Sequence, residues 1–217
     1  MEIKVLNLYA GLGGNRKFWD NCEVTSVELD EKLWETYHQL YPNDCVVQGD
    51  AHEFLLEYHQ DFDFIWSSPP CQSHSRMIRG GKNRKPRYVD LKLYEEILFL
   101  QNDYDGLWVV ENVVPWYSPL VPPSSKVGRH LFWSNFDFDA KEVPQPNDFI
   151  KGTNVAASEA LKDWLGIHYE GNIYYGSNHC PAQVLRNCVH PLVGKSIFDR
   201  VTALMIEKDF KELNHEV

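Results

Sequence analysis

One cysteine of this chain stands in a setting that favours nucleophilic chemistry. Residues 62–66, Phe-Asp-Phe-Ile-Trp, are typical of a buried strand, and Ser-Ser-Pro-Pro-Cys-Gln-Ser follows them directly. The two prolines restrict the backbone and place Cys71 just beyond the end of the expected strand. A thiol in that position is suited to attack on a substrate rather than to burial. Cys71 is therefore the candidate nucleophile.

A carboxylate follows another strand-like run. Residues 107–110 are Leu-Trp-Val-Val, and Glu111-Asn112-Val113 comes next. If this strand and the one before Cys71 are neighbours in a sheet, the Glu111 side chain emerges beside the thiol. The alternative is a solvated charge at a strand end, but placement beside a candidate nucleophile favours a functional role.

A glycine-rich turn follows the first apolar run, residues 3–9. Residues 9–14 are Tyr9, Ala10, Gly11, Leu12, Gly13 and Gly14, and a helix is expected over residues 15–19. Glycines let the backbone turn tightly and approach a ligand closely, with the helix N-terminus behind it. A turn that simply needs small residues would have the same sequence, so the motif alone does not prove a ligand site.

Acidic residues end the second and third expected strands. Glu28 is placed to bind ribose hydroxyls, as an acid does at the corresponding point of dinucleotide folds, whereas Asp30 is expected to cap the next helix. Asp50 follows Gly49 and precedes Ala51. It could accept from an adenine amino group or cap the helix after it, and both interpretations remain open.

Six basic residues are concentrated between Cys71 and Asp90, a segment without an acidic side chain. They are Arg76, Arg79, Lys82, Arg84, Lys85 and Arg87. One interpretation is a solvated loop. The other is a mobile lid, starting at Gln72 and Ser73, that contacts phosphates and closes over the nucleophile.

The elements that must position these residues alternate between strands and helices. Strands are predicted at residues 3–9, 23–29, 45–48, 62–66 and 107–110, and helices at 15–19, 31–40, 51–59 and 91–100. This alternation predicts an α/β fold with a mostly parallel sheet and helices on both faces. Ligands of such sheets bind at the carboxyl ends of the strands, where all the candidate residues stand.

The remaining sequence and the composition limit the alternatives. Residues 136–183 break the alternation and contain one helical pattern, at 158–165, and residues 192–210 are helical again. A net charge of −10 argues against a protein that coats nucleic acid non-specifically. Five widely spaced cysteines without a Cys-x-x-Cys pair argue against disulfides and structural zinc. With no long apolar run and no signal-like start, we expect a cytoplasmic protein without membrane contact or metal.

Taken together, these motifs resemble the cytosine-C5 DNA methyltransferase family. The similar segments occur in order at residues 9–14, 27–30, 49–51, 69–72, 111–113, 128–133 and 183–189. The resemblance implies the Rossmann-like fold of a methyltransferase that depends on S-adenosylmethionine. It assigns residues 1–135 and 184–217 to catalysis and cofactor binding, and residues 136–183 to a small target-recognition region.

The resemblance also implies roles for individual residues. It places Cys71, Glu111 and Arg129 in catalysis on a cytosine that is flipped out of double-stranded DNA. The residues implied for cofactor binding are Tyr9, Ala10, Gly11, Gly13, Gly14, Glu28, Leu29, Asp50, Ala51, Pro69, Asn187 and Cys188. Gln72, Ser73 and the six basic residues would contact DNA. A compact monomer of this kind resembles the enzymes of phages and of restriction-modification systems.

Three departures from the family pattern keep alternatives open. Arg129 is followed by His130 and Leu131, so the family's second arginine two residues on is missing, and Arg186-Asn187-Cys188 replaces Gly-Asn-Ser. The target-recognition region is short, so a separate specificity partner could supply recognition. The alternatives are a tRNA substrate, a modified sulfonium cofactor, and an idle regulatory relative that needs a partner chain. A nucleotide-level transferase similar to thymidylate synthase is disfavoured by the glycine-rich turn.

Overall fold

A computed structural model of the protein describes residues 2–76, 88–147, 149, 155–174 and 180–215. Its centre is a seven-stranded sheet in the order β3-β2-β1-β4-β5-β7-β6. The strands are β1 (Ile3–Leu8), β2 (Cys22–Glu28), β3 (Cys45–Gln48), β4 (Phe64–Ser67), β5 (Leu107–Val113), β6 (Ser125–Val127) and β7 (His130–Ser134). The first five strands in that order are parallel, whereas β7 and β6 pair antiparallel. The predicted α/β fold with a mostly parallel sheet is confirmed.

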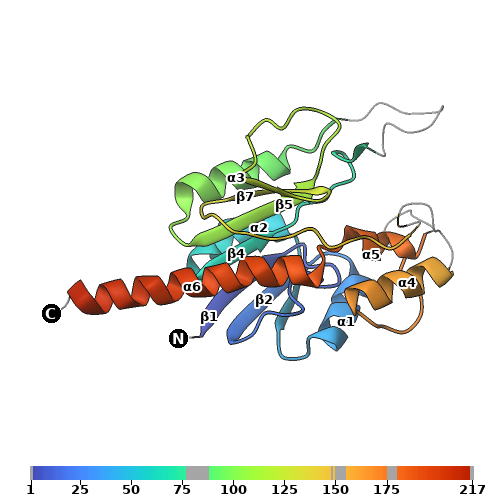
Figure 1. The fold of residues 1–217 in the computed structure, drawn as a ribbon, viewed down its shortest axis with the longest axis horizontal. Helices are drawn as coiled ribbons and strands as arrows, with labels where there is room; N and C mark the ends of the chain where they lie inside the picture. Colours follow the sequence, from blue (N-terminus) through green and yellow to red (C-terminus); the bar gives the residue numbers. More distant parts are fainter. Residues whose placement is uncertain (1, 77–87, 148, 150–154, 175–179, 216–217) are drawn as a thin grey trace.

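Helices cover both faces of this sheet (Figure 1). They are α1 (Glu31–Leu40), α2 (Ala51–Tyr58), the short η1 (His59–Asp61), α3 (Lys92–Asp103), α4 (Val155–Leu165), α5 (Ala182–Asn187) and α6 (Pro191–His215). Successive side chains of a strand point to opposite faces. Val5 of β1 accordingly packs in the cluster of α6 with Ile197, and Leu6 packs on the other face with Leu55 of α2.

Two aspartates start the helices that follow β2 and β3. Asp30 Oδ1 accepts from the backbone N of Lys32 and Leu33, at 3.1 and 3.2 Å. Asp50 Oδ1 accepts from the backbone N of His52 and Glu53, at 2.8 and 3.3 Å. The capping role is therefore confirmed for Asp30 and is one of the two roles foreseen for Asp50.

The prediction of a helix at residues 15–19 is wrong, because this segment forms successive turns. Trp19 is buried and its ring stacks on Phe198 of α6, with 5.1 Å between the centroids. A Cβ added at Gly194 of α6 would lie only 2.2 Å from the carbonyl oxygen of Asn15. The close packing of α6 on this segment therefore favours turns that return the chain to β2.

The sequence analysis did not predict β6, β7, α5 or the short η1. The antiparallel pair of β6 and β7 extends the sheet beyond β5, and α5 packs on α4. Leu161 and Leu165 of α4 share a core with Leu12 of the glycine-rich turn and Leu33 of α1. The described part of residues 136–183 thus packs directly against the first turn of the sheet.

Candidate active site

A cavity lies at the carboxyl ends of the parallel strands, where the sequence places the candidate residues. It is lined by eleven of the twelve predicted cofactor residues, namely Tyr9, Ala10, Gly11, Gly14, Glu28, Leu29, Asp50, Ala51, Pro69, Asn187 and Cys188. Cys71, Gln72 and Glu111 line the same cavity. The strand order alone explains this convergence, because β2, β1, β4 and β5 are successive neighbours in the sheet.

Gly13 is the predicted cofactor residue that does not line the cavity. Its φ is +66°, and a Cβ there would lie 2.4 Å from Cε2 of Tyr41 and 2.7 Å from Cε2 of Tyr37. Glycine at this position therefore serves the packing of the turn against two aromatic rings of the α1 region. Gly13 is not among the residues that line the cavity, and its contact with the cofactor stays a prediction.

Glu28 braces the glycine-rich turn from the end of β2. Its Oε2 accepts from the backbone N of Gly11 at 2.9 Å, and its Oε1 accepts from the backbone N of Asp30 at 2.9 Å. Burial raises the pKa of this carboxyl, while the backbone donors oppose the shift. Each oxygen keeps a further lone pair, so the carboxylate can also accept from a ligand hydroxyl in the cavity.

The chain segment after α5 closes the other side of the turn. A Cβ at Gly14 would lie 2.5 Å from the carbonyl oxygen of Val189 and 2.8 Å from Cβ of Cys188. Burial raises the pKa of the Cys188 thiol to about 12, so this group is a neutral part of the wall. The late motif foreseen at residues 183–189 thus returns to the first turn, as expected.

Cys71 lies at the end of the cavity next to β5. The neighbouring strands β4 and β5 pair in parallel, and Asn112 Nδ2 donates to the Pro69 carbonyl at 2.8 Å, which holds the Pro-Pro-Cys segment against β5. Burial, and then the negative charge of Glu111, raise the pKa of the Cys71 thiol to about 11, while Arg129 opposes the shift. The thiol is therefore protonated at neutral pH and must lose its proton for attack.

Glu111 is held from behind by a residue whose role the sequence did not indicate. His130 Nδ1 lies 2.6 Å from Glu111 Oε1, and Arg129 Nε donates to His130 Nε2 at 3.0 Å. Arg129 also donates to the Arg186 carbonyl, and its guanidinium lies 5.0 Å from the ring centroid of Phe149. Arg129 lines a smaller hollow beside the main cavity, so it is placed behind Glu111 rather than in the cavity wall.

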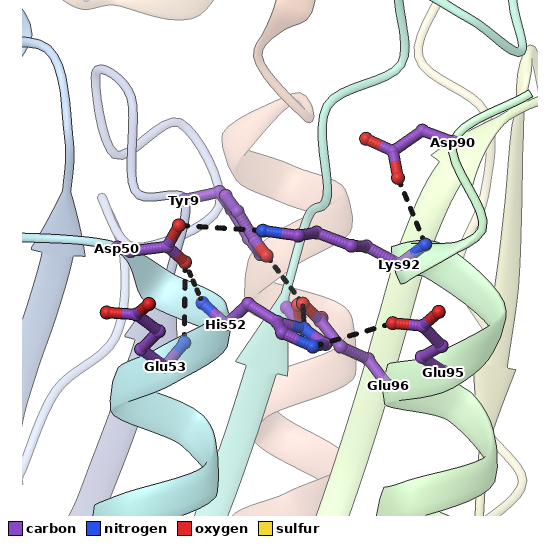
Figure 2. A network of polar contacts seen from close by, with 9 residues as sticks. Tyr9, Asp50, His52, Glu53, Asp90, Lys92, Glu95 and Glu96 are labelled. Carbon is purple, nitrogen blue, oxygen red and sulfur yellow. Dashed lines mark hydrogen bonds and ion pairs between the residues drawn. The ribbon is translucent and has the colours of Figure 1, made fainter. Parts of the chain in front are cut away.

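The cavity mouth near α2 and α3 carries charged groups that the sequence analysis did not single out. Asp90 and Lys92 line the cavity, and Lys92 Nζ lies 3.5 Å from Asp50 Oδ2 (Figure 2). Asp50 therefore caps α2 with one oxygen and turns the other toward Lys92 and the cavity. Asp90 lies just before α3, and Lys92 is the first residue of that helix. Their position could have been recognised as a further strand-to-helix connection.

The predicted DNA-contacting residues are only partly described. Arg79, Lys82, Arg84, Lys85 and Arg87 lie outside the described residues. Ser73 Oγ accepts from the backbone N of Asp90 at 3.0 Å, and Arg76 Nε donates to the Pro115 carbonyl at 3.2 Å. Gln72 is exposed and lines the cavity. The segment after Cys71 is thus docked on the loop that follows β5.

Within the part of the chain that the structure describes, no group of three or more His, Cys, Asp or Glu side chains is arranged to hold a metal ion. In the same residues, no helix is long and apolar enough to cross a membrane.

The fold and the cavity define the class of protein. A mostly parallel seven-stranded sheet, with helices on both faces and a glycine-rich turn after β1, is the Rossmann-like fold of S-adenosylmethionine-dependent methyltransferases. The model of the C-5 cytosine-specific DNA methylase family matches residues 3–113, and the chain belongs to this family. The match includes the glycine-rich turn, Cys71 and Glu111, and it ends before Arg129. The methyl donor of the family is S-adenosylmethionine.

Several solved structures are similar to part of the chain. A mutant of DNMT2 from Spodoptera frugiperda is 23% identical, with 51% of this chain and 35% of that chain covered and a TM-score of 0.37. A TehB-like SAM-dependent methyltransferase from Corynebacterium glutamicum is 20% identical, with 54% and 59% covered and a TM-score of 0.35. A SAM-dependent methyltransferase from Agrobacterium tumefaciens is 18% identical, with 54% and 41% covered and a TM-score of 0.37. The matches therefore span less than two thirds of these three chains. Comparison with curated protein sequences finds no match.

Proposed function

We propose that this protein is a DNA (cytosine-5-)-methyltransferase, in which Cys71 forms a covalent bond to C6 of a flipped cytosine. One observation carries the proposal. Cys71 and Glu111 line the same cavity as the glycine-rich turn, Glu28 and Asp50. A nucleophile, a carboxylate and a nucleotide-type cofactor site thus open into one space.

The cofactor residues fit S-adenosylmethionine by their chemistry. A Cβ at Gly11 would lie 4.0 Å from the nearest neighbouring atom, the Tyr9 carbonyl oxygen, so the turn leaves open space on the cavity side. Glu28 offers acceptors for ribose hydroxyls, and Asp50 Oδ2 offers one for an adenine amine. Leu29, Ala51 and Pro69 supply apolar wall around them. When bound, this cofactor supplies an electrophilic methyl group.

The catalytic residues would act in sequence on the cytosine ring. The Cys71 thiol gives up its proton, and the thiolate attacks C6, which makes C5 nucleophilic. Glu111 hydrogen-bonds N3 and the exocyclic amine, so that N3 gains a proton as negative charge develops in the ring. After C5 has taken the methyl group, a base removes the C5 proton and the C6–S bond breaks. As the aromatic ring is restored, N3 returns its proton and the released thiolate takes one up, so the products are 5-methylcytosine, the free Cys71 thiol, S-adenosylhomocysteine and one proton.

The proposed substrate is a cytosine in duplex DNA. C6 is hidden in a duplex, so the target base must leave the stack. Gln72, Ser73 and the basic residues from Arg76 to Arg87 are proposed to contact the DNA backbone. Residues 136–183 are proposed as the target-recognition region, alone or with a specificity partner. A monomer acting in the cytoplasm of a bacterial or phage-infected cell fits this proposal.

Methyl transfer from tritiated S-adenosylmethionine tests the function. Duplex DNA, tRNA and free deoxycytidine nucleotides are offered in parallel to the wild type, to Cys71→Ser and to Cys45→Ser. Cys45 is exposed on β3, so its variant is the matched control. We expect 5-methylcytosine in DNA with the wild type and the control, and none with Cys71→Ser. Label in tRNA alone would keep the chemistry but change the substrate, and transfer by Cys71→Ser would remove Cys71 from the mechanism.

A further inference from the structure

Glu96 of α3 is a carboxylate with no solvent exposure (0%). Removing a carboxylate from water is costly unless hydrogen bonds or opposite charge compensate it. Its described partners are Tyr9, Ser67 and His52, and they come from three different segments of the chain. A charged group in this setting stabilises one arrangement of those segments relative to one another.

The two carboxylate oxygens have different partners. Tyr9 Oη donates to Oε1 at 2.5 Å, and Ser67 Oγ donates to Oε2 at 2.5 Å. His52 Nδ1 lies 3.0 Å from Oε1 (Figure 2). Such short O–H···O contacts to a carboxylate are typical of strong, charge-assisted hydrogen bonds. Burial and the charge of Glu96 raise the pKa of Tyr9, so its hydroxyl remains a donor.

The two hydroxyl donors stand at the starts of the two functional segments. Tyr9 lines the cavity, opens the glycine-rich turn and has a φ of +55°, which is costly for a residue other than glycine. Ser67 is the last residue of β4 and pairs with Leu8 of β1, directly before Tyr9. The chain reaches Cys71 four residues after Ser67.

We propose that Glu96 is a positioning residue that couples the cofactor-binding turn to the segment carrying Cys71. Its Oε1 holds the turn through Tyr9, and its Oε2 holds the end of β4 through Ser67. A change at either end is therefore transmitted to the other through one rigid carboxylate. This inference rests on the proposed roles of the turn and of Cys71.

Two measurements that need no nucleic acid test the coupling. Affinity for S-adenosylhomocysteine, measured by calorimetry, reports on the turn. The rate of Cys71 alkylation by iodoacetamide in cofactor-free protein, measured by peptide mass spectrometry, reports on the nucleophile. Failure of the coupling and failure of the proposed DNA activity are thereby separated, because DNA methylation is assayed independently.

The decisive variants are Tyr9→Phe and Ser67→Ala, each of which removes one hydroxyl. We expect Tyr9→Phe to change the Cys71 alkylation rate, and Ser67→Ala to weaken S-adenosylhomocysteine binding, each by about three- to tenfold. Ser67 is buried behind the cavity wall, so its effect on affinity must be transmitted. In a Glu96→Gln background, neither substitution should have a comparable further effect.

Glu95→Gln is the matched control. Glu95 is the neighbouring acid on α3, its side chain is 61% exposed, and it lies 3.6 Å from the same histidine, His52. We expect its variant to leave both measurements unchanged. The proposal is overturned if Tyr9→Phe leaves the Cys71 alkylation rate unchanged and Ser67→Ala leaves S-adenosylhomocysteine affinity unchanged. It is also overturned if these two effects persist in the Glu96→Gln background. If Glu96→Gln does not fold, two effects decide: that of Tyr9→Phe on Cys71 alkylation and that of Ser67→Ala on S-adenosylhomocysteine binding. Their presence supports the proposal, and their absence overturns it.

Discussion

His130 Nδ1 lies 2.6 Å from Glu111 Oε1, across the antiparallel pair of β7 and β5. The contact is short, although the two atoms are not aligned as in an ideal hydrogen bond. Arg129 Nε donates to His130 Nε2, so this ring nitrogen accepts a hydrogen bond and Nδ1 faces the carboxylate. His130 therefore restrains one oxygen of Glu111 and leaves the other for a substrate.

We predict that His130→Leu lowers the kcat of methyl transfer by about tenfold, because Glu111 loses the group that orients it. Affinity for S-adenosylhomocysteine should not change, because His130 is not part of the main cavity wall. His130→Gln keeps a donor and should recover part of kcat. Steady-state kinetics at saturating cofactor check this, and equal losses in the two variants would contradict it.

The reactivity of Cys71 should depend on pH through its raised pKa of about 11. Below that value the thiolate fraction, and with it the alkylation rate, rises about tenfold per pH unit. Glu111→Gln removes a negative charge that raises this pKa, so it should speed alkylation at pH 8. Arg129→Leu removes a charge that lowers it and should slow the reaction. Peptide mass spectrometry of Cys71 between pH 7 and 9.5 gives the rates. A change of the alkylation rate in the same direction for both variants would count against this electrostatic account.

The sequence sufficed for the parts of the site that depend on strand ends. Cys71 and Glu111 meet because β4 and β5 are neighbours, as the alternation of strands and helices suggested. The sequence did not reveal the position of His130, because the alternation of strands and helices predicts parallel strands. It gives no signal for an antiparallel strand after β5. Glu96 had a signal that was missed, since it lies on the apolar stripe of Leu93, Ile97 and Leu100 at helical spacing. The turns at residues 15–19 depend on α6, which is distant in sequence and cannot be inferred locally.

Stability should vary with pH through His52. Its hydrogen bond to Glu96 raises the pKa of His52, while burial and Lys92 oppose the shift and Glu95 supports it. A group with a raised pKa in the folded state stabilises the protein fully below its unfolded pKa, and this contribution is lost as pH rises through the folded pKa. The difference in unfolding free energy between wild type and His52→Gln should therefore be largest below about pH 6.5. Urea unfolding from pH 5.5 to 8.5 measures it, and a difference that grows with pH would contradict the assignment.

A side chain at Gly14 should lower the stability of the fold. Neighbouring atoms, rather than the backbone conformation of Gly14, leave no space for it. A Cβ there would lie 2.5 Å from the Val189 carbonyl oxygen, a backbone atom that cannot rotate away. We expect Gly14→Ala to lower the free energy of unfolding by about 1–3 kcal/mol and to weaken S-adenosylhomocysteine binding. Gly49→Ala is the control, since its Cβ would meet only Val47 Cγ1, at an ordinary 3.9 Å. Urea unfolding should separate the two variants, and calorimetry measures the affinity of Gly14→Ala. Equal stability would mean that the segment after α5 can move away from the turn.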